Sequence, residues 1–267
     1  MRSPVVADRF YPGSPKELSQ TISDYFSAAP NAEKFKALAV VSPHAGYVYS
    51  GELAAQTLAA VEIPETVIIL GPNHHGQGEP VSLSAETWDM PLGRVPVDSE
   101  ITDKLLENCP HIKLDETAHR SEHSLEVQVP FLQVLQKQLH IVPIVVSQIS
   151  YQLCEEVAMS LAKTIKNSRK NLLMVASSDM SHYEPRRITE QKDHSALQCI
   201  ERLDPYGLYR TVFDNRISMC GVIPVVIAML AAKACGAEHS HLIGYTDSGY
   251  VSGDTSQVVG YAGVVIN

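Results

Sequence analysis

Short runs of β-branched and apolar residues that alternate with helical segments constrain the fold of this sequence more than any other feature. Four such runs are predicted to be buried strands, at 36–42, 66–70, 141–147 and 171–178. Helices are predicted from Ser14, at 51–61, 98–109, 150–166, 188–202 and 205–213, and after Cys220. This alternation predicts an α/β fold with a mostly parallel or mixed central sheet that helices cover on both faces.

Nothing in the sequence divides the chain into parts. It has no low-complexity linker, long block of charge or internal repeat, so residues 1–267 are predicted to form a single domain. Its last two apolar segments, "HLIGYT" and "QVVGYAGVVI", are predicted to pair as strands and to return to the sheet.

Three helix boundaries have specific signals. Ser14 and Glu17 form a capping-box pattern around Pro15, which suits the first helical position. Asp98 is a good N-cap for the helix at 98–109. The stretch from 124 to 138 has apolar residues at helical spacing but contains Pro130, so a kinked or split helix is expected there.

The composition excludes several classes of protein. The chain carries a net charge of −9 without a basic stripe, which argues against nucleic acid as a partner. Its longest apolar run, 221–232, is too short to span a bilayer and contains Pro224, so a buried helix is expected and no membrane partner. Five cysteines without a CxxC pair, and no apolar signal segment, indicate a cytoplasmic protein with reduced thiols.

Unusual polar residues follow three of the four predicted strands. They are His44 after the first run, His74 and His75 in "GPNHHG" after the second, and Asp179 and His182 in "SSDMSHY" after the fourth. In open α/β sheets, ligands bind outside the carboxyl ends of the strands. These side chains are therefore expected to converge on one site.

Each of these residues has a functional and a structural interpretation. His44 suits a metal ligand, or else a histidine bonded within a turn. Because adjacent side chains diverge, His74 is the expected ligand and His75 a supporting or surface group. A helical turn from Asp179 would place His182 on the same face, where the carboxylate would orient the imidazole. The alternative is an Asp cap followed by an unrelated histidine.

Two further segments carry candidate site residues. Cys220 in "MCG" precedes an apolar helix, whose N-terminus would stabilise a thiolate that binds metal or acts as a nucleophile. The other four cysteines are expected to be buried apolar residues. In "SEHSLEVQVPF", Glu122 and Glu126 are spaced for one helical face, where such pairs are usually solvated. His123 lies where the tract turns apolar, which favours a role in a site.

These segments together resemble one known family. The sequence contains "VADRFYPGSP", "SPHAGYVYSG", "LGPNHHG", "EHSLEVQVPF", "SSDMSHY" and "MCG", in this order and over nearly the whole chain. In them it resembles the Memo-like family, also called system protein B of the AmmeMemoRadiSam cluster. That family is similar in fold to the class III extradiol ring-cleaving dioxygenases (LigB-like), which have a single α/β domain.

The resemblance implies a set of site residues. The dioxygenases hold Fe(II) with two histidines and a glutamate, and carrying this over implies His44 and His74 as metal ligands with Cys220 in place of the carboxylate. His182 would be the acid/base histidine, with Asp179 and His123 lining the pocket. Iron (Fe²⁺) is the expected metal, and the thiolate makes copper or zinc the alternatives.

Three functions follow as hypotheses, and whether the protein is an enzyme stays open among them. The first is metal-dependent redox or oxygen chemistry on a small-molecule or peptide ligand. The second, to which the resemblance also points, is a non-catalytic module that binds a metal, a (phospho)peptide or a metabolite and acts with a radical SAM protein partner. The third is a hydrolase with Cys220 as nucleophile and His182 as base, which requires the two side chains within hydrogen-bond reach.

Overall fold

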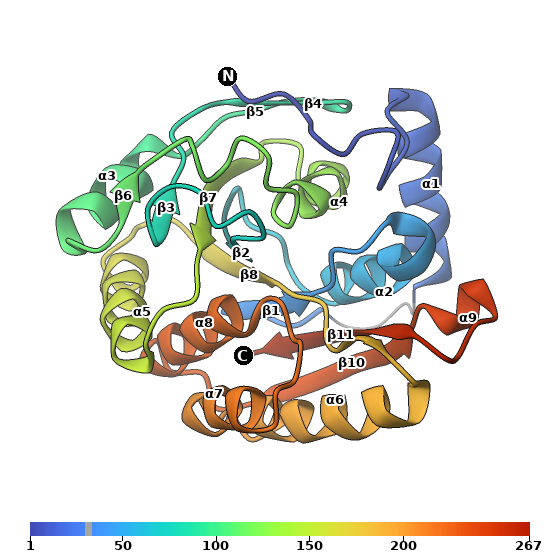
Figure 1. Cartoon of the computed structure of the whole chain (residues 1–267). Helices are drawn as coiled ribbons and strands as arrows, with labels where there is room; N and C mark the ends of the chain where they lie inside the picture. Colours follow the sequence, from blue (N-terminus) through green and yellow to red (C-terminus); the bar gives the residue numbers. More distant parts are fainter. Residues whose placement is uncertain (30–33) are drawn as a thin grey trace.

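The computed structural model describes residues 1–29 and 34–267, and its centre is a mixed β-sheet (Figure 1). Its strands in chain order are β1 (Ala39–Ser42), β2 (Thr66–Pro72), β3 (Val81–Leu83), β6 (Lys113–Leu114), β7 (His140–Val146), β8 (Leu172–Ser177), β9 (His182–Glu184), β10 (Ser240–Asp247) and β11 (Val258–Ile266). A separate hairpin consists of β4 (Trp88–Met90) and β5 (Gly93–Val95).

The order of the strands across the sheet is β10-β11-β1-β8-β2-β7-β3-β6, with β9 paired to β11. The four central strands β1, β8, β2 and β7 are parallel. On either side of them β11 and β3 run antiparallel to their neighbours. The predicted mixed sheet is therefore confirmed, as is the predicted pairing of the last two strands, β10 and β11.

Helices cover both faces of the sheet, as predicted. They are α1 (Pro15–Ala28), α2 (Tyr47–Ala59), α3 (Ser99–Asn108), the 3₁₀ helix η1 (Glu126–Gln128), α4 (Val129–Leu135), α5 (Tyr151–Lys166), α6 (Arg186–Glu201), α7 (Pro205–Asp214), α8 (Val222–Ala234) and α9 (Gly249–Ser252). Helices α1, α2 and α4 pack together on one face, and α5, α7 and α8 pack together on the other (Figure 1).

The helix boundaries follow most of their sequence signals. Asp98 caps α3 by accepting a hydrogen bond from the backbone N of Ile101, as predicted. Ser14 precedes α1, but its side chain makes no capping hydrogen bond, so the predicted capping box does not form. The split predicted from Pro130 is confirmed, because a 3₁₀ turn precedes α4 and the proline lies in the first turn of α4. An N–H group is not needed at that position.

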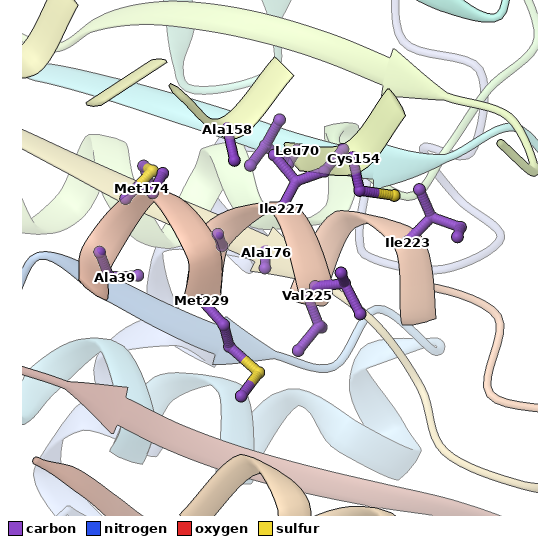
Figure 2. Packing of buried hydrophobic residues seen from close by; sticks show 14 of the residues in the cluster. Ala39, Leu70, Cys154, Ala158, Met174, Ala176, Ile223, Val225, Ile227 and Met229 are labelled. Carbon is purple, nitrogen blue, oxygen red and sulfur yellow. The ribbon is translucent and has the colours of Figure 1, made fainter. Parts of the chain in front are cut away.

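Helix α8 is the apolar helix expected after Cys220, and its packing explains its composition. It lies on β1, β2 and β8 and is also covered by α5 and α7, so nearly all of its residues are buried. In Figure 2, Ile227 points toward Leu70 and Ala158, whereas Val225 and Met229 point to the opposite side of the helix. Within the described ranges, no helix combines the length and apolar character needed to cross a membrane.

Candidate metal centre

The carboxyl ends of the central strands bring the predicted histidines together. His44 follows β1 and His74 follows β2, and their ring centroids lie 5.3 Å apart. His123, from the loop before η1, lies 5.7 Å from His44 and 4.6 Å from His74 between ring centroids. One candidate ligand atom from each of these three rings lies within 4.8 Å of the others. Three segments far apart in the sequence thus form one histidine cluster.

His44 is buried, and its backbone and both ring nitrogens make polar contacts. Its backbone N donates to Asp179 Oδ1 at 2.8 Å, and its Nδ1 lies 3.0 Å from Ser177 Oγ. Its Nε2 lies 3.4 Å from Cys220 Sγ. Burial and the neighbouring His74 lower the pKa of His44 to about 3, so the imidazole is neutral at pH 7. It is therefore fixed in place and carries a lone pair.

His74 is oriented by a buried carboxylate. Its Nδ1 donates to Glu122 Oε1 at 2.8 Å, and its backbone N donates to Glu122 Oε2 at 2.7 Å. Burial alone would lower the pKa of His74, but the hydrogen bond and charge of Glu122 outweigh it and raise this pKa. Burial alone would raise the pKa of Glu122. The hydrogen bonds that Glu122 accepts from His74 and from the backbone outweigh burial and hold this pKa well below its usual range. A bond from Nδ1 leaves Nε2 as the free nitrogen of His74.

The structure overturns the solvated interpretation of the Glu122 and Glu126 pair. Both side chains are fully buried, and residues 122–125 are not helical, so the two carboxylates do not share a helical face. Glu126 accepts hydrogen bonds from the backbone of Val5 and Val6, and Arg2 forms an ion pair with it at 2.8 Å. Arg2 also donates from Nη2 to the carbonyl oxygen of Glu122 at 2.5 Å. The N-terminal segment therefore anchors the loop that carries Glu122 and His123.

His123 lines the pocket, as the resemblance implies. Its ring stacks on His74 with 19° between the ring planes, and its Nδ1 lies 3.6 Å from Glu122 Oε1. The ring of Phe10 packs edge-on against it at 4.8 Å. Burial and the neighbouring His44 lower the pKa of His123 to about 4. By contrast, His75 is exposed, as expected for the second of two adjacent histidines.

His182 lines the same pocket, but the local backbone structure predicted for it does not form. Residues 179–181 are not helical and His182 begins β9, so the helical-turn prediction is wrong, as is the helix cap. The His182 backbone N donates to Ser218 Oγ at 2.8 Å, and its Nδ1 donates to the Ser218 carbonyl oxygen at 2.9 Å. Asp179 instead holds the backbone of His44, and burial raises its pKa. Sequence reasoning missed Ser218 altogether.

Cys220 lies one residue before Gly221, the N-cap of α8, as predicted. Its Sγ accepts a hydrogen bond from the backbone N of Asp179 at 3.2 Å. Burial, followed by the charge of Asp179, raises the pKa of the Cys220 thiol well above its usual value, so this group is protonated when no metal is bound. A Cβ on Gly221 would collide with the carbonyl oxygen of Ser177. The glycine therefore allows the thiol to approach the end of β8.

His44, His74, His123 and His182 line a pocket of about 640 Å³. Its wall is formed by four histidines, four other aromatic residues, two acids and a polar loop. The aromatic residues are Phe10, Tyr49, Tyr183 and Tyr261, and the acids are Asp179 and Asp254. Among the described residues that line it, none is lysine or arginine. An anionic ligand would therefore meet no lysine or arginine on the described part of the pocket wall.

Comparison with known proteins agrees with the resemblance. A sequence profile of the family described as "Memo-like protein" matches residues 2–265. A MEMO1 family protein of Aquifex aeolicus is 41% identical over 267 residues, covering 99% of this chain and 98% of that protein. A MEMO1 family protein of Methanosarcina barkeri is 38% identical over the full length of both.

One solved structure shows a related fold at low sequence identity. It is an uncharacterized protein of Escherichia coli K12, with a TM-score of 0.59 and 12% identity, and the match covers 85% of this chain and 98% of that one.

Proposed function

The chain belongs to the Memo-like protein family, and from this premise we propose that it binds one metal ion through His44, His74 and Cys220. The observation that carries the proposal is the cluster of His44, His74 and His123 near the carboxyl ends of the parallel strands, together with the contact between Cys220 Sγ and His44 Nε2. Ligand sites in α/β sheets lie at this edge.

The spacing of two of these donors, His44 and Cys220, suits ligands of one ion. Imidazole nitrogen and thiolate sulfur bind a metal such as zinc at about 2.1 and about 2.3 Å, so two such ligands in a tetrahedral arrangement lie about 3.5 Å apart. His44 Nε2 and Cys220 Sγ are 3.4 Å apart. Ligand atoms of His44, His74 and His123 lie within 4.8 Å of one another, so His123 is a further candidate ligand.

The donor set also bears on which metal is bound. Two imidazoles and a thiolate accept iron, copper or zinc. We propose iron (Fe²⁺), with copper or zinc as the alternatives. When bound, iron or copper would supply redox or oxygen chemistry to a ligand in the pocket.

His182 is the group that we assign to proton transfer. Its Nδ1 donates to a carbonyl oxygen, which can only accept, so the unprotonated Nε2 is free to take a proton. Its ring lines the same pocket as His44, His74 and His123. Asp179 acts differently from the orienting role expected for it, because it fixes the backbone of His44.

The two other hypotheses have less support. A module for anionic peptides or metabolites would have to bind them without a lysine or arginine from the described pocket wall. A cysteine hydrolase needs Cys220 beside His182, but the imidazole next to Cys220 is His44, and burial raises the pKa of the thiol. An unreactive Cys220 toward a thiol probe at neutral pH would retire the hydrolase.

The first test is metal content by elemental analysis of protein purified without oxygen. Near-stoichiometric iron or copper is expected, with loss of the metal in His44→Ala and Cys220→Ser. His75→Ala is the matched control, because His75 adjoins His74 but does not line the pocket, and it should keep the metal.

The His123→Ala variant separates the two candidates for the third ligand. If it loses the metal while Cys220→Ser keeps it, the ion sits on three histidines instead. If the native protein takes up no iron, copper or zinc even after reconstitution, the metal proposal fails and the binding module becomes the better hypothesis.

A further inference from the structure

Ser177, the last residue of β8, contacts His44 of the candidate metal centre. Its side chain is fully buried, and its oxygen lies within hydrogen-bond distance of three groups. These are Ser124 O at 2.7 Å, Gln128 Nε2 at 2.9 Å and His44 Nδ1 at 3.0 Å. A hydroxyl has one hydrogen to donate and two lone pairs with which to accept. The three contacts therefore use its full capacity, and the direction of each can be assigned.

The direction of two of the contacts is fixed by chemistry. Ser124 offers a carbonyl oxygen, which can only accept, so the Ser177 hydrogen points to it. Gln128 Nε2 also faces the carbonyl oxygen of Pro43 at 2.9 Å, which fixes the orientation of the amide. The amide nitrogen must then donate to Ser177 Oγ.

The third contact follows by elimination. The only hydrogen of the Ser177 hydroxyl is already used, so His44 Nδ1 must donate to the oxygen. A neutral imidazole carries one proton, so Nε2 is left with its lone pair. Nε2 in turn lies 3.4 Å from Cys220 Sγ, whose S–H can donate to it.

We propose that Ser177 is a positioning residue that holds His44 in the Nδ1–H tautomer and so directs the Nε2 lone pair toward Cys220 before any metal arrives. This proposal rests on the proposed function, because a free lone pair on Nε2 is what a metal ligand needs. The partners that orient a ligating histidine typically change metal affinity about 10–100-fold when they are removed.

The chain offers a matched control for Ser177. Ser42 is its register partner on the neighbouring strand β1 and is equally buried. Its hydroxyl oxygen has no hydrogen-bond partner among the described residues. Ser42→Ala and Ser177→Ala therefore remove the same atom at the same depth, but only the second removes a contact to His44.

The test is nitrogen-15 NMR of the imidazole rings in the metal-free protein, which shows which ring nitrogen carries the proton. His44 is assigned by its absence in His44→Gln. The wild type, Ser42→Ala and Ser177→Thr should show a protonated Nδ1, because threonine restores the hydroxyl. In Ser177→Ala the proton should move to Nε2, which faces the sulfur of Cys220. Zn²⁺ affinity, measured by competition with a chelator, should fall about 10–100-fold in Ser177→Ala alone.

The outcomes separate this proposal from the metal proposal. A wild-type spectrum with the proton on Nε2 would overturn the role of Ser177, even if Ser177→Ala failed to fold. An unchanged tautomer and Zn²⁺ affinity in folded Ser177→Ala would overturn it too. If the tautomers behave as expected but the wild type binds no metal, the role of Ser177 stands and the metal proposal falls.

Discussion

Replacing Glu122 by glutamine tests how much of the candidate centre depends on one buried carboxylate. Glu122 is 1% exposed and accepts four hydrogen bonds. The donors are His74 Nδ1 at 2.8 Å, His74 N at 2.7 Å, His123 N at 2.9 Å and Ser124 N at 2.8 Å. Glutamine keeps one acceptor oxygen and turns an NH₂ group toward at least one of these donors.

The size of the effect follows from these contacts. An unsatisfied buried donor costs about 1–3 kcal/mol, and the remaining bonds lose the charge that makes them about twice as strong. We therefore expect the free energy of unfolding to fall by on the order of 3 kcal/mol. Because His74 loses its fixed orientation, the affinity for Zn²⁺ should fall about 10–100-fold, which corresponds to about 1.4–2.8 kcal/mol.

The assay is urea unfolding of the metal-free protein together with chelator competition for Zn²⁺. Glu126→Gln is the matched control, since Glu126 is equally buried but its bonds go to the N-terminal segment rather than to a histidine. It should lose stability and keep its affinity for Zn²⁺. A folded Glu122→Gln protein with native Zn²⁺ affinity would refute the claim that the carboxylate orients His74.

Three other predictions concern the rest of the molecule. His119 is buried and its pKa is lowered from 6.5 to about 4, so its contribution to stability is full above pH 6.5 and is lost as the pH falls toward 4. Between pH 7 and pH 5, His119 should lower the free energy of unfolding by about 2 kcal/mol. Urea unfolding should therefore show a smaller loss of stability over this range in His119→Gln than in the wild type. Equal pH dependence in both proteins would contradict this. Ile227→Ala, in the centre of α8, should destabilise the protein by about 2–5 kcal/mol in thermal or urea unfolding, whereas Met159→Ala on the exposed side of α5 should change stability by less than about 0.5 kcal/mol. Arg2→Met should cost about 3–5 kcal/mol, because it leaves the charge of Glu126 buried without its partner, and a near-native unfolding midpoint would argue against that.

The parts of the site that sequence could locate are those set by strand ends. His44 and His74 each follow an apolar run, and the carboxyl ends of parallel strands meet at one edge, so their proximity follows from the fold class. Cys220 could be placed at a helix start for a similar reason, because the glycine and the apolar run after it mark the boundary.

The parts that sequence could not locate depend on contacts between distant segments. Glu122 and His74 are 48 residues apart, and Ser218 and His182 are 36 apart, with no local pattern that pairs them. The helical turn expected at Asp179 does not form, because the chain pairs with β11 from His182 onward.

The pairing of β1 with β11 has a consequence for how the protein reaches its native state. Ala39 lies opposite Ile266, and His44 touches Cys220 only when α8 has docked against β8. During synthesis, the edge of β1 that pairs with β11 therefore stays open until Val258–Ile266 has left the ribosome. Folds dominated by such long-range contacts form slowly and expose unpaired strand edges while they do. We expect the metal centre to be among the last features to form, and nascent chains that lack β11 to depend on chaperones.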